Sequence, residues 1–169
     1  MKPGVSKRER ALTDPQEILR ILDTAKVLHM GLVDGDEPYV IPMNYGYTME
    51  GEKLTLYLHS ATASRKLDVI RANPKVFFSL ECDVIPFDGV LPCQYGVTYA
   101  SVAGKGTAHI VEDVEEKKAA MTVLMKTQTG KDFDFNERLV SIVSVIRIDV
   151  SVYTAKRRYL PERLQAMQG

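Results

Sequence analysis

The feature that most constrains this chain is a long alternation of apolar and polar residues near its C-terminal end. Within residues 142–154, Ile146 and Ile148 alternate with Arg147 and Asp149, and the same pattern continues to the end of the segment. Successive side chains of a β-strand point to opposite faces, so this alternation predicts a long strand with one apolar face. We therefore expect this segment to be a principal strand of the fold.

Five further segments carry the signals of strands. They span residues 27–33, 38–47, 54–59, 76–82 and 95–111. Pro42 lacks an N–H group in the middle of the second segment, which a sheet tolerates only at an edge, a bulge or a break, and we expect that strand to be split or bulged there. Gly104 and Gly106 predict a bulge in the last segment. Residues 83–94 and 127–136 are polar or rich in turn residues and are expected to be loops.

Three segments carry helix signals and are inserted between these strands. The first begins after Asp14, the second follows Thr62 and ends before Pro74, and the third begins after Asp113. Six antiparallel strands with inserted helices favour a closed barrel over a parallel sheet. The predicted fold class is therefore mainly β, a six-stranded antiparallel Greek-key barrel with about three helices.

The second helix carries an unusual charge at its start, because Arg65 and Lys66 lie in its first turn. A helix N-terminus presents unpaired N–H groups and a partial positive charge, which disfavours each cation by about 0.3–1 kcal/mol. The other two helices open with acidic residues. The hydroxyls of Ser60, Thr62 and Ser64 gather at the same corner. A bound phosphate would explain this arrangement, and the alternative is a solvated Arg-Lys pair on a surface helix.

Composition limits the kinds of partner. The chain has 169 residues, which corresponds to a single domain, with residues 1–12 expected to form a flexible or draped arm and residues 159–169 a polar tail. The 22 basic and 22 acidic residues cancel, so no overall field favours nucleic acid or an anionic membrane. The N-terminal residues lack the apolar core of a signal peptide, and no apolar run is long enough to span a bilayer. We expect a cytoplasmic location.

The cysteines and two of the histidines carry no recognisable site. Cys82 and Cys93 have no neighbouring ligands to complete a zinc set, and we expect ordinary thiols. A disulfide closing the intervening loop is the alternative, which a reducing cytosol disfavours. His29 and His109 have no second ligand at metal spacing, so both are interpreted as structural and no metal site is predicted. The sequence also lacks the motifs of catalysis by protein groups alone.

Four fragments in a fixed order carry a family resemblance. They are YVIPMNYGY at 39–47, LYLHSA at 56–61 followed by Arg65-Lys66, YASV at 99–102 followed by Gly104 and Gly106, and TAKR at 154–157. With them, the chain resembles the pyridoxamine 5′-phosphate oxidase-like flavin-binding split-barrel superfamily, and most closely its nitroimidazole-resistance (Nim) branch. The resemblance extends from the Asp14 helix to Arg158. Ser64 departs from it, because Nim-type sequences commonly carry Gly there, which affects how closely the backbone approaches a phosphate.

The resemblance implies a split-barrel homodimer with two FMN sites at the subunit interface. The strand with Pro42 and Asn44 would lie along the flavin ring, and Arg65 and Lys66 would hold the phosphate. The end of the long C-terminal strand would approach the cofactor from the same or the other subunit. FAD is a possible replacement for FMN. The implied cofactor-binding residues are Ile41, Pro42, Met43, Asn44, His59, Ser60, Ala61, Arg65, Lys66, Tyr99, Ser101, Val102, Lys156 and Arg157.

His59 has four interpretations that the sequence leaves open. It shares a strand face with Tyr57, where an imidazole could stack near a flavin, bind substrate or ligate a haem iron. The alternative is a surface or interface histidine held by one hydrogen bond. Site residues gather at the ends of elements, which favours a site role.

The function implied is that of an FMN-dependent oxidoreductase. The resemblance suggests reduction of small electron-poor molecules such as nitroimidazoles or nitroaromatics, with NAD(P)H as the expected donor. Because the flavin carries such chemistry, no catalytic protein residue is assigned. Two alternatives stay open: a non-catalytic flavin or haem binder, and a pyridoxamine phosphate oxidase-like enzyme, for which the short C-terminal tail offers few further phosphate anchors.

Overall fold

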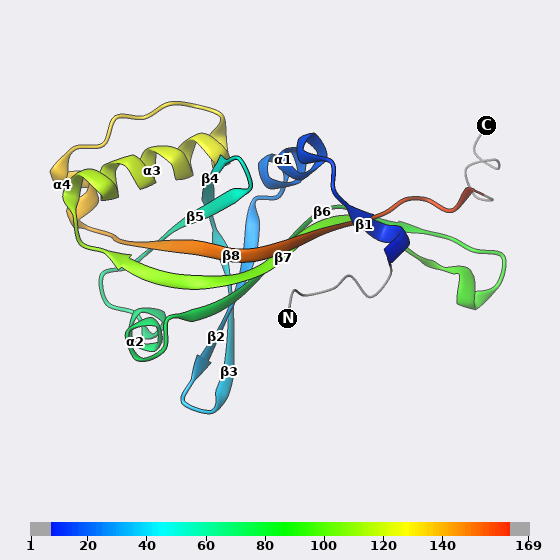
Figure 1. The fold of residues 1–169 in the computed structure, drawn as a ribbon, viewed down its shortest axis with the longest axis horizontal. Helices are drawn as coiled ribbons and strands as arrows, with labels where there is room; N and C mark the ends of the chain where they lie inside the picture. The colour runs from blue at the N-terminus through cyan, green and yellow to red at the C-terminus, as the bar shows by residue number, and fades with distance from the viewer. Residues whose placement is uncertain (1–7, 163–169) are drawn as a thin grey trace.

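The structure, a computed structural model, describes residues 8–162 as one curled antiparallel sheet with helices packed against it (Figure 1). The strands are β1 (Ala11–Leu12), β2 (Val27–Asp34), β3 (Glu37–Asn44), β4 (Gly46–Glu50), β5 (Lys53–Ser60), β6 (Lys75–Phe87), β7 (Gly96–Val111) and β8 (Ser144–Arg158). The helices are α1 (Pro15–Thr24), α2 (Arg65–Ala72), α3 (Val114–Thr129) and α4 (Glu137–Ser141), with short 3-10 helices η1 (Arg8–Arg10) and η2 (Pro92–Gln94). The strand order is β3-β2-β6-β7-β8-β5-β4, with β1 beside β8. This confirms the predicted class, mainly β with inserted helices.

The sheet curls into a barrel because its two outermost strands are consecutive in the chain. β3 and β4 lie at opposite ends of the strand order, and only Tyr45 separates them. Tyr45 is fully buried, and its hydroxyl lies 2.7 Å from the carbonyl oxygen of Leu22 and 3.0 Å from that of Ala25. The predicted 38–47 strand is thus divided at Tyr45. Together with the short β1, this division gives eight described strands instead of six.

Of the two strand irregularities expected from the sequence, one is present. Pro42 lies in β3 opposite His29 with no shift of register, so the split or bulge expected at this proline is wrong. Among the described strands β3 pairs only with β2, and this edge position tolerates the missing N–H group. The register between β7 and β8 shifts between Lys105 and Gly106, which confirms the predicted bulge. A Cβ atom on Gly106 would collide with the backbone of Asp149, so close approach of β8 explains the glycine.

The prediction of a loop over residues 83–94 is wrong for much of that segment. β6 continues to Phe87 and pairs with the start of β7, in a ribbon that begins beyond a bulge at Asp83. Asp83 takes a left-handed conformation, φ +57°, which re-aims the strand. The sequence suggests a loop because Pro86 and Gly89 lie there, but Pro86 is tolerated in a ribbon without further neighbours.

Helix boundaries differ from expectation at two places. α3 continues to Thr129, where Gly130 in a left-handed conformation ends it, so the expected loop over residues 127–136 begins later than predicted. The short α4, which the sequence analysis does not predict, follows this loop behind an Asn136 cap. The N-cap of α2 is Ser64 and not Thr62, so the helix begins directly at its basic pair. The prediction that Arg65 and Lys66 occupy the first turn is confirmed.

The apolar core fills the barrel, and α3 covers part of its outside. Leu56, Leu58 and Leu80 are fully buried inside, and a smaller cluster around Met121 lies under α3. A Cβ atom on Gly46 would collide with the backbone of α3 at Leu124, so this glycine lets the helix contact β4 directly. Close packing on both sides makes the sheet a rigid frame for a site.

Part of the expected N-terminal arm is draped on the sheet. Ala11 and Leu12 pair with β8, whereas residues 1–7 and 163–169 of the expected arm and tail lie outside the described residues. In the described part of the chain, Cys82 is buried, Cys93 is exposed and neither forms a disulfide, as expected. Of the helices that the structure describes, none is long and apolar enough to cross a membrane.

Candidate functional site

The corner between β5 and α2 gathers hydroxyl and ammonium groups. Ser60 is the last residue of β5 and is buried, and its hydroxyl lies 2.9 Å from that of Ser64. Lys66 Nζ donates to Ser60 Oγ at 3.3 Å. Ala61 is exposed beside them. A serine pair and an ammonium group at a helix start form a donor set suited to phosphate oxygens.

The first turn of α2 keeps its backbone donors available. Ser64 occupies the N-cap position, but its side chain makes no capping hydrogen bond with the described residues. By contrast, Asp14 accepts from Gln16 N in α1, and Asp113 accepts from Glu116 N in α3. Leu67 N donates to the carbonyl oxygen of Ser64 at 3.0 Å, whereas the N–H groups of Arg65 and Lys66 have no side-chain acceptor among the described residues. Such uncapped N–H groups at a helix start can bind an anion.

Arg65 extends away from this corner toward the β2–β3 hairpin. Its Nε donates to Asp34 Oδ2 at 2.7 Å, and its Nη2 lies 2.7 Å from the same oxygen. Its guanidinium lies over the ring of Tyr39, 5.2 Å from the centroid. The structure thus brings Lys66 and the serines together, but it directs the neighbouring cation to a carboxylate. That both cations hold one phosphate stays a prediction.

The predicted residues of β3 divide between the two faces of that strand. Ile41 and Met43 are half-buried and pack on the core, whereas Pro42 and Asn44 are exposed on the other face. The amide of Asn44 donates to the carbonyl oxygen of Lys26 at 3.2 Å. A ligand lying on either face of β3 would therefore contact only part of the predicted set.

His59 lies on the face of β5 opposite to Ser60, because successive residues of a strand alternate. It shares this face with Tyr57, as expected. Its Nδ1 atom is buried and has no hydrogen-bond partner among the described residues. A buried ring nitrogen without a partner costs free energy, so this atom is a plausible contact for a ligand.

A second group of predicted residues lies where β7 meets the end of β8. Ser101 pairs in register with Lys156, and Tyr99 lies on the same face of β7 as Ser101. Tyr99 accepts a long hydrogen bond, 3.5 Å, from Arg10. Val102 is fully buried in the barrel core, so its side chain is not accessible to a ligand and only its backbone could contribute.

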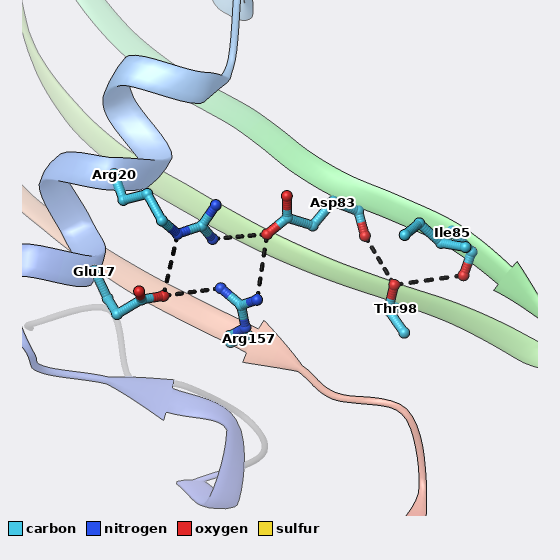
Figure 2. A network of polar contacts seen from close by, with 6 residues as sticks. All are labelled: Glu17, Arg20, Asp83, Ile85, Thr98 and Arg157. Carbon is cyan, nitrogen blue, oxygen red and sulfur yellow. Dashed lines mark hydrogen bonds and ion pairs between the residues drawn. The ribbon is translucent and has the colours of Figure 1, made fainter. Parts of the chain in front are cut away.

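Arg157 belongs to a polar network between α1, β6 and β8, which Figure 2 shows. It donates to Glu17 at 2.8 Å and lies 3.4 Å from Asp83. Arg20 donates to Asp83 at 2.6 Å and to Glu17 at 3.3 Å. The hydrogen bond from Arg20 to Asp83 raises the pKa of the Arg20 guanidinium. The sequence does not single out Glu17, Arg20 or Asp83, because their partners are 63 and 140 residues away.

The two groups of predicted residues lie at opposite ends of β8. Ser60 pairs with Ser144 at the start of this strand, and Ser101 pairs with Lys156 near its end. At ~3.3 Å per residue, the intervening strand spans about 40 Å. In Figure 1, α2 lies below one end of β8, whereas β1 marks the other. One chain therefore does not bring the two groups together.

One cavity of the described molecule is lined by residues that the sequence does not indicate. It has a volume of about 510 Å³ and lies on the outer face of β4, β5 and β8, below the first turn of α3. Its lining residues are Thr48, Glu50, Lys53, Thr55, Tyr57, Glu116, Arg147 and Asp149. Arg147 is held there between Glu116 and Asp149. The charges that line the cavity are largely paired with one another, so the cavity shows no preference for an anion.

The two other histidines each lie beside one carboxylate. His29 Nδ1 lies 3.9 Å from Glu81, and His109 Nε2 lies 3.2 Å from Asp149. No group of three or more metal-ligating side chains occurs among the described residues. Each histidine thus has one carboxylate neighbour, in agreement with a structural role.

Comparison with known proteins places this geometry in a family. The family model of pyridoxamine 5′-phosphate oxidase matches residues 14–157. The chain belongs to the pyridoxamine 5′-phosphate oxidase family. The match begins at the cap of α1 and ends in β8, so it covers both groups of predicted residues. Among curated proteins, none matches the chain.

Solved structures share the same split-barrel fold. A candidate 5-nitroimidazole antibiotic resistance protein from Bacteroides thetaiotaomicron is 29% identical, with a TM-score of 0.74 over 87% of this chain and 86% of that chain. The flavocytochrome Anf3 from Azotobacter vinelandii is 17% identical, with a TM-score of 0.72 over 96% of this chain and 78% of the other. A FAD and haem binding protein from Mycobacterium smegmatis is 15% identical, with a TM-score of 0.74 over 93% and 80% of the two chains. The last two show the fold alone.

Proposed function

We propose that this protein binds FMN and acts as an oxidoreductase that reduces small electron-poor molecules, with nitroimidazoles or nitroaromatics as the substrate class and NAD(P)H as the donor. The observation that carries this proposal is the donor set at the start of α2, where Ser60, Ser64 and Lys66 lie within hydrogen-bond distance of one another beside a helix start that has no side-chain cap. Membership of the pyridoxamine 5′-phosphate oxidase family supports a flavin as the ligand. Similarity to the candidate nitroimidazole resistance protein supports the substrate class.

The residues of this corner would hold the phosphate of the cofactor. Lys66 supplies a charge, the two serines supply hydroxyl donors, and Arg65 would complete the set on leaving Asp34. β3 is an edge strand, so alternate backbone N–H groups face away from β2 and are available to the flavin ring. A bound flavin would supply electron transfer, while the protein supplies orientation and excludes water.

We further propose that the site is shared between two copies of the chain. Lys156 and Ser101 lie about 40 Å along β8 from the phosphate corner, at ~3.3 Å per residue. A second copy related by a two-fold axis would bring its own Lys156 beside the first copy's α2. This arrangement supports the homodimer implied by the resemblance.

The phosphate site is tested by comparing FMN with riboflavin, which lacks the phosphate. Replacing Lys66 and Arg65 together by Ala should weaken FMN binding by about 100-fold or more, because two charge-assisted contacts are lost. Riboflavin binding should change little. Fluorescence titration measures both, and equal losses for the two flavins would place the phosphate elsewhere. Wild-type protein that takes up no flavin would overturn the proposal.

Activity requires a separate measurement. Protein loaded with FMN should oxidise NADH or NADPH in the presence of a nitroimidazole and convert the nitro group. Flavin binding without turnover of any nitro compound would leave the cofactor proposal standing and remove the substrate class. Turnover of pyridoxamine 5′-phosphate instead would favour the oxidase activity after which the family is named.

Haem binding is a second candidate, and His59 is the observation that favours it. Its Nδ1 is buried without a partner among the described residues, and of the proteins with the same fold one is named a FAD and haem binding protein and another a flavocytochrome. If haem binds through this ring, the purified protein reconstituted with haem will show a Soret band that His59→Ala abolishes. The matched control is His29→Ala, since His29 is exposed beside Glu81. A Soret band that survives in His59→Ala would exclude this ligand.

A further inference from the structure

The β6–β7 hairpin projects beyond the sheet as a two-stranded ribbon, which we call the arm (residues 83–98). β2 pairs with β6 only as far as Leu80, and β8 pairs with β7 only from Tyr99 onward. Both outer edges of the arm are therefore without a strand partner among the described residues. Figure 1 shows the arm extending past β1, at the end of the sheet away from α2.

The arm exposes apolar side chains that a free surface ribbon does not ordinarily carry. Ile85 is 63% exposed and Val90 is 77% exposed. The complete set of exposed large apolar residues on the arm is Val84, Ile85, Val90, Leu91, Tyr95 and Val97. Between residues 84 and 98, Asp88 is the only charged residue. Exposed edges are ordinarily protected by charges, and a concentrated apolar patch marks a protein interface.

The base of the arm is fixed in direction by two contacts. Asp83, held by Arg20 and Arg157, accepts at its carbonyl oxygen a hydrogen bond of 2.8 Å from the hydroxyl of Thr98 (Figure 2). Arg158 lies over the ring of Phe87, 5.0 Å from its centroid. An isolated two-stranded hairpin is marginal in water, so a ribbon anchored this way is suited to hold a docking surface in place.

We infer that the arm docks on a second copy of this chain and covers the proposed cofactor site of that copy at the start of α2. This inference rests on the shared site proposed above and concerns its partner surface. The arm continues directly from Tyr99 and from the Ser101–Lys156 pair. When these residues of one copy reach α2 of the other, the arm is carried onto the same copy. It would bury its apolar side chains there and limit which substrates enter the site.

The first experiment measures dimerisation without cofactor. The double variant Ile85→Glu/Val90→Glu should raise the dimer dissociation constant at least tenfold in sedimentation equilibrium. The matched control is Phe133→Glu/Leu139→Glu, which places two charges on exposed apolar positions near α3 and α4, 40% and 46% exposed. The control should leave the constant unchanged. Circular dichroism checks that both variants fold. An unchanged constant in the arm variant, or equal weakening by both variants, would overturn the inference.

The second experiment tests whether the arm acts on the other copy's site. Lys66→Ala protein and arm-variant protein are mixed, each binding FMN poorly by itself. In a mixed dimer, the unaltered α2 of one chain meets the unaltered arm of the other, so one site per dimer should be restored. Random exchange at a concentration above the dimer dissociation constant makes about half of the dimers mixed, so FMN stoichiometry of the mixture should rise to about a quarter of the wild-type value. No restoration would show that the arm serves its own chain and would overturn the inference, whereas failure of wild-type protein to bind FMN would overturn only the proposed function.

Discussion

At the scale of single residues, Asp34 is the unexpected member of the candidate site. Its carboxylate pairs with the Arg65 guanidinium, where a phosphate would otherwise bind. Asp34 Oδ2 lies 2.7 Å from both Nε and Nη2 of Arg65. A phosphate that binds at the start of α2 must compete with this carboxylate. The pair is largely exposed, so its contribution is small, about 0.2–1 kcal/mol. Asp34 is therefore expected to weaken the hold on phosphate.

The variant Asp34→Asn tests this competition. Removing the carboxylate charge should tighten FMN binding by roughly two- to fivefold, the equivalent of that exposed pair, and leave riboflavin binding unchanged. Asp68→Asn is the control, because Asp68 pairs with Arg71 on the same helix at 2.8 Å. Fluorescence titration of both flavins gives the constants. Weaker FMN binding in Asp34→Asn would show that the carboxylate instead orients Arg65 for the phosphate.

Ionisation of Tyr45 is expected to lower the stability of the fold at alkaline pH. Burial raises the pKa of its hydroxyl above the ordinary value of 10.0. A raised pKa in the folded state stabilises the fold below pH 10, and this stabilisation is lost as the pH rises further, because the unfolded tyrosine ionises first. Urea unfolding should show stability falling above pH 10 and less steeply in Tyr45→Phe. At pH 7 that variant should lose about 1–2 kcal/mol, because the buried carbonyl oxygens of Leu22 and Ala25 lose their donor. An identical pH dependence in both proteins would contradict this role.

At the scale of elements, the periodic segments could be predicted and the contacts between distant elements could not. The alternation around Ile148 and the capping residues Asp14 and Asp113 report local geometry, so β8, α1 and α3 follow from them. The ribbon beyond Asp83 depends on Arg20 and on β8, which no local pattern indicates. α4 has five residues, too few for a periodic signal.

The same distinction applies to the candidate site. Two basic residues at a helix start are visible in the sequence, and the structure confirms their place in α2. Side-chain direction and tertiary contacts determine two other features of the site, which the sequence does not report. Arg65 extends to Asp34, and His59 and Ser60 face opposite sides of β5. The separation of Ser60 from Lys156 along β8 requires the strand register, which the sequence leaves unspecified.

The contact between α3 and β4 depends on one glycine. A Cβ atom at Gly46 would lie within 3 Å of three backbone atoms of α3, and the helix backbone cannot yield as a flexible side chain could. Gly46→Ala should therefore destabilise the fold by about 1–3 kcal/mol in urea unfolding. Glu50→Ala, at the exposed end of the same strand, is the control and should change stability by less than about 0.5 kcal/mol. Equal stability of the two variants would show that α3 shifts away without cost.

At the scale of the whole molecule, a site divided between two copies couples cofactor binding to assembly. The phosphate corner lies beside α2 and the second group of predicted residues lies near Lys156, so only a dimer would present both to one ligand. A ligand that binds the assembled state stabilises that state by mass action. FMN should then strengthen the dimer, and dilution of the protein should weaken FMN binding.

Measuring FMN affinity across protein concentrations tests this coupling. The apparent FMN dissociation constant should rise at least tenfold when the protein is diluted from well above to well below its dimer dissociation constant, because in the proposed arrangement a monomer would hold only part of the contacts. FMN at saturating concentration should lower the dimer dissociation constant in sedimentation equilibrium, since linkage is reciprocal. Riboflavin should act in the same direction but more weakly, because it lacks the phosphate that Lys66 and the serines would hold. An FMN affinity that is constant while the dimer dissociates would mean that one chain carries the complete site, and the residues near Lys156 would then have no part in it.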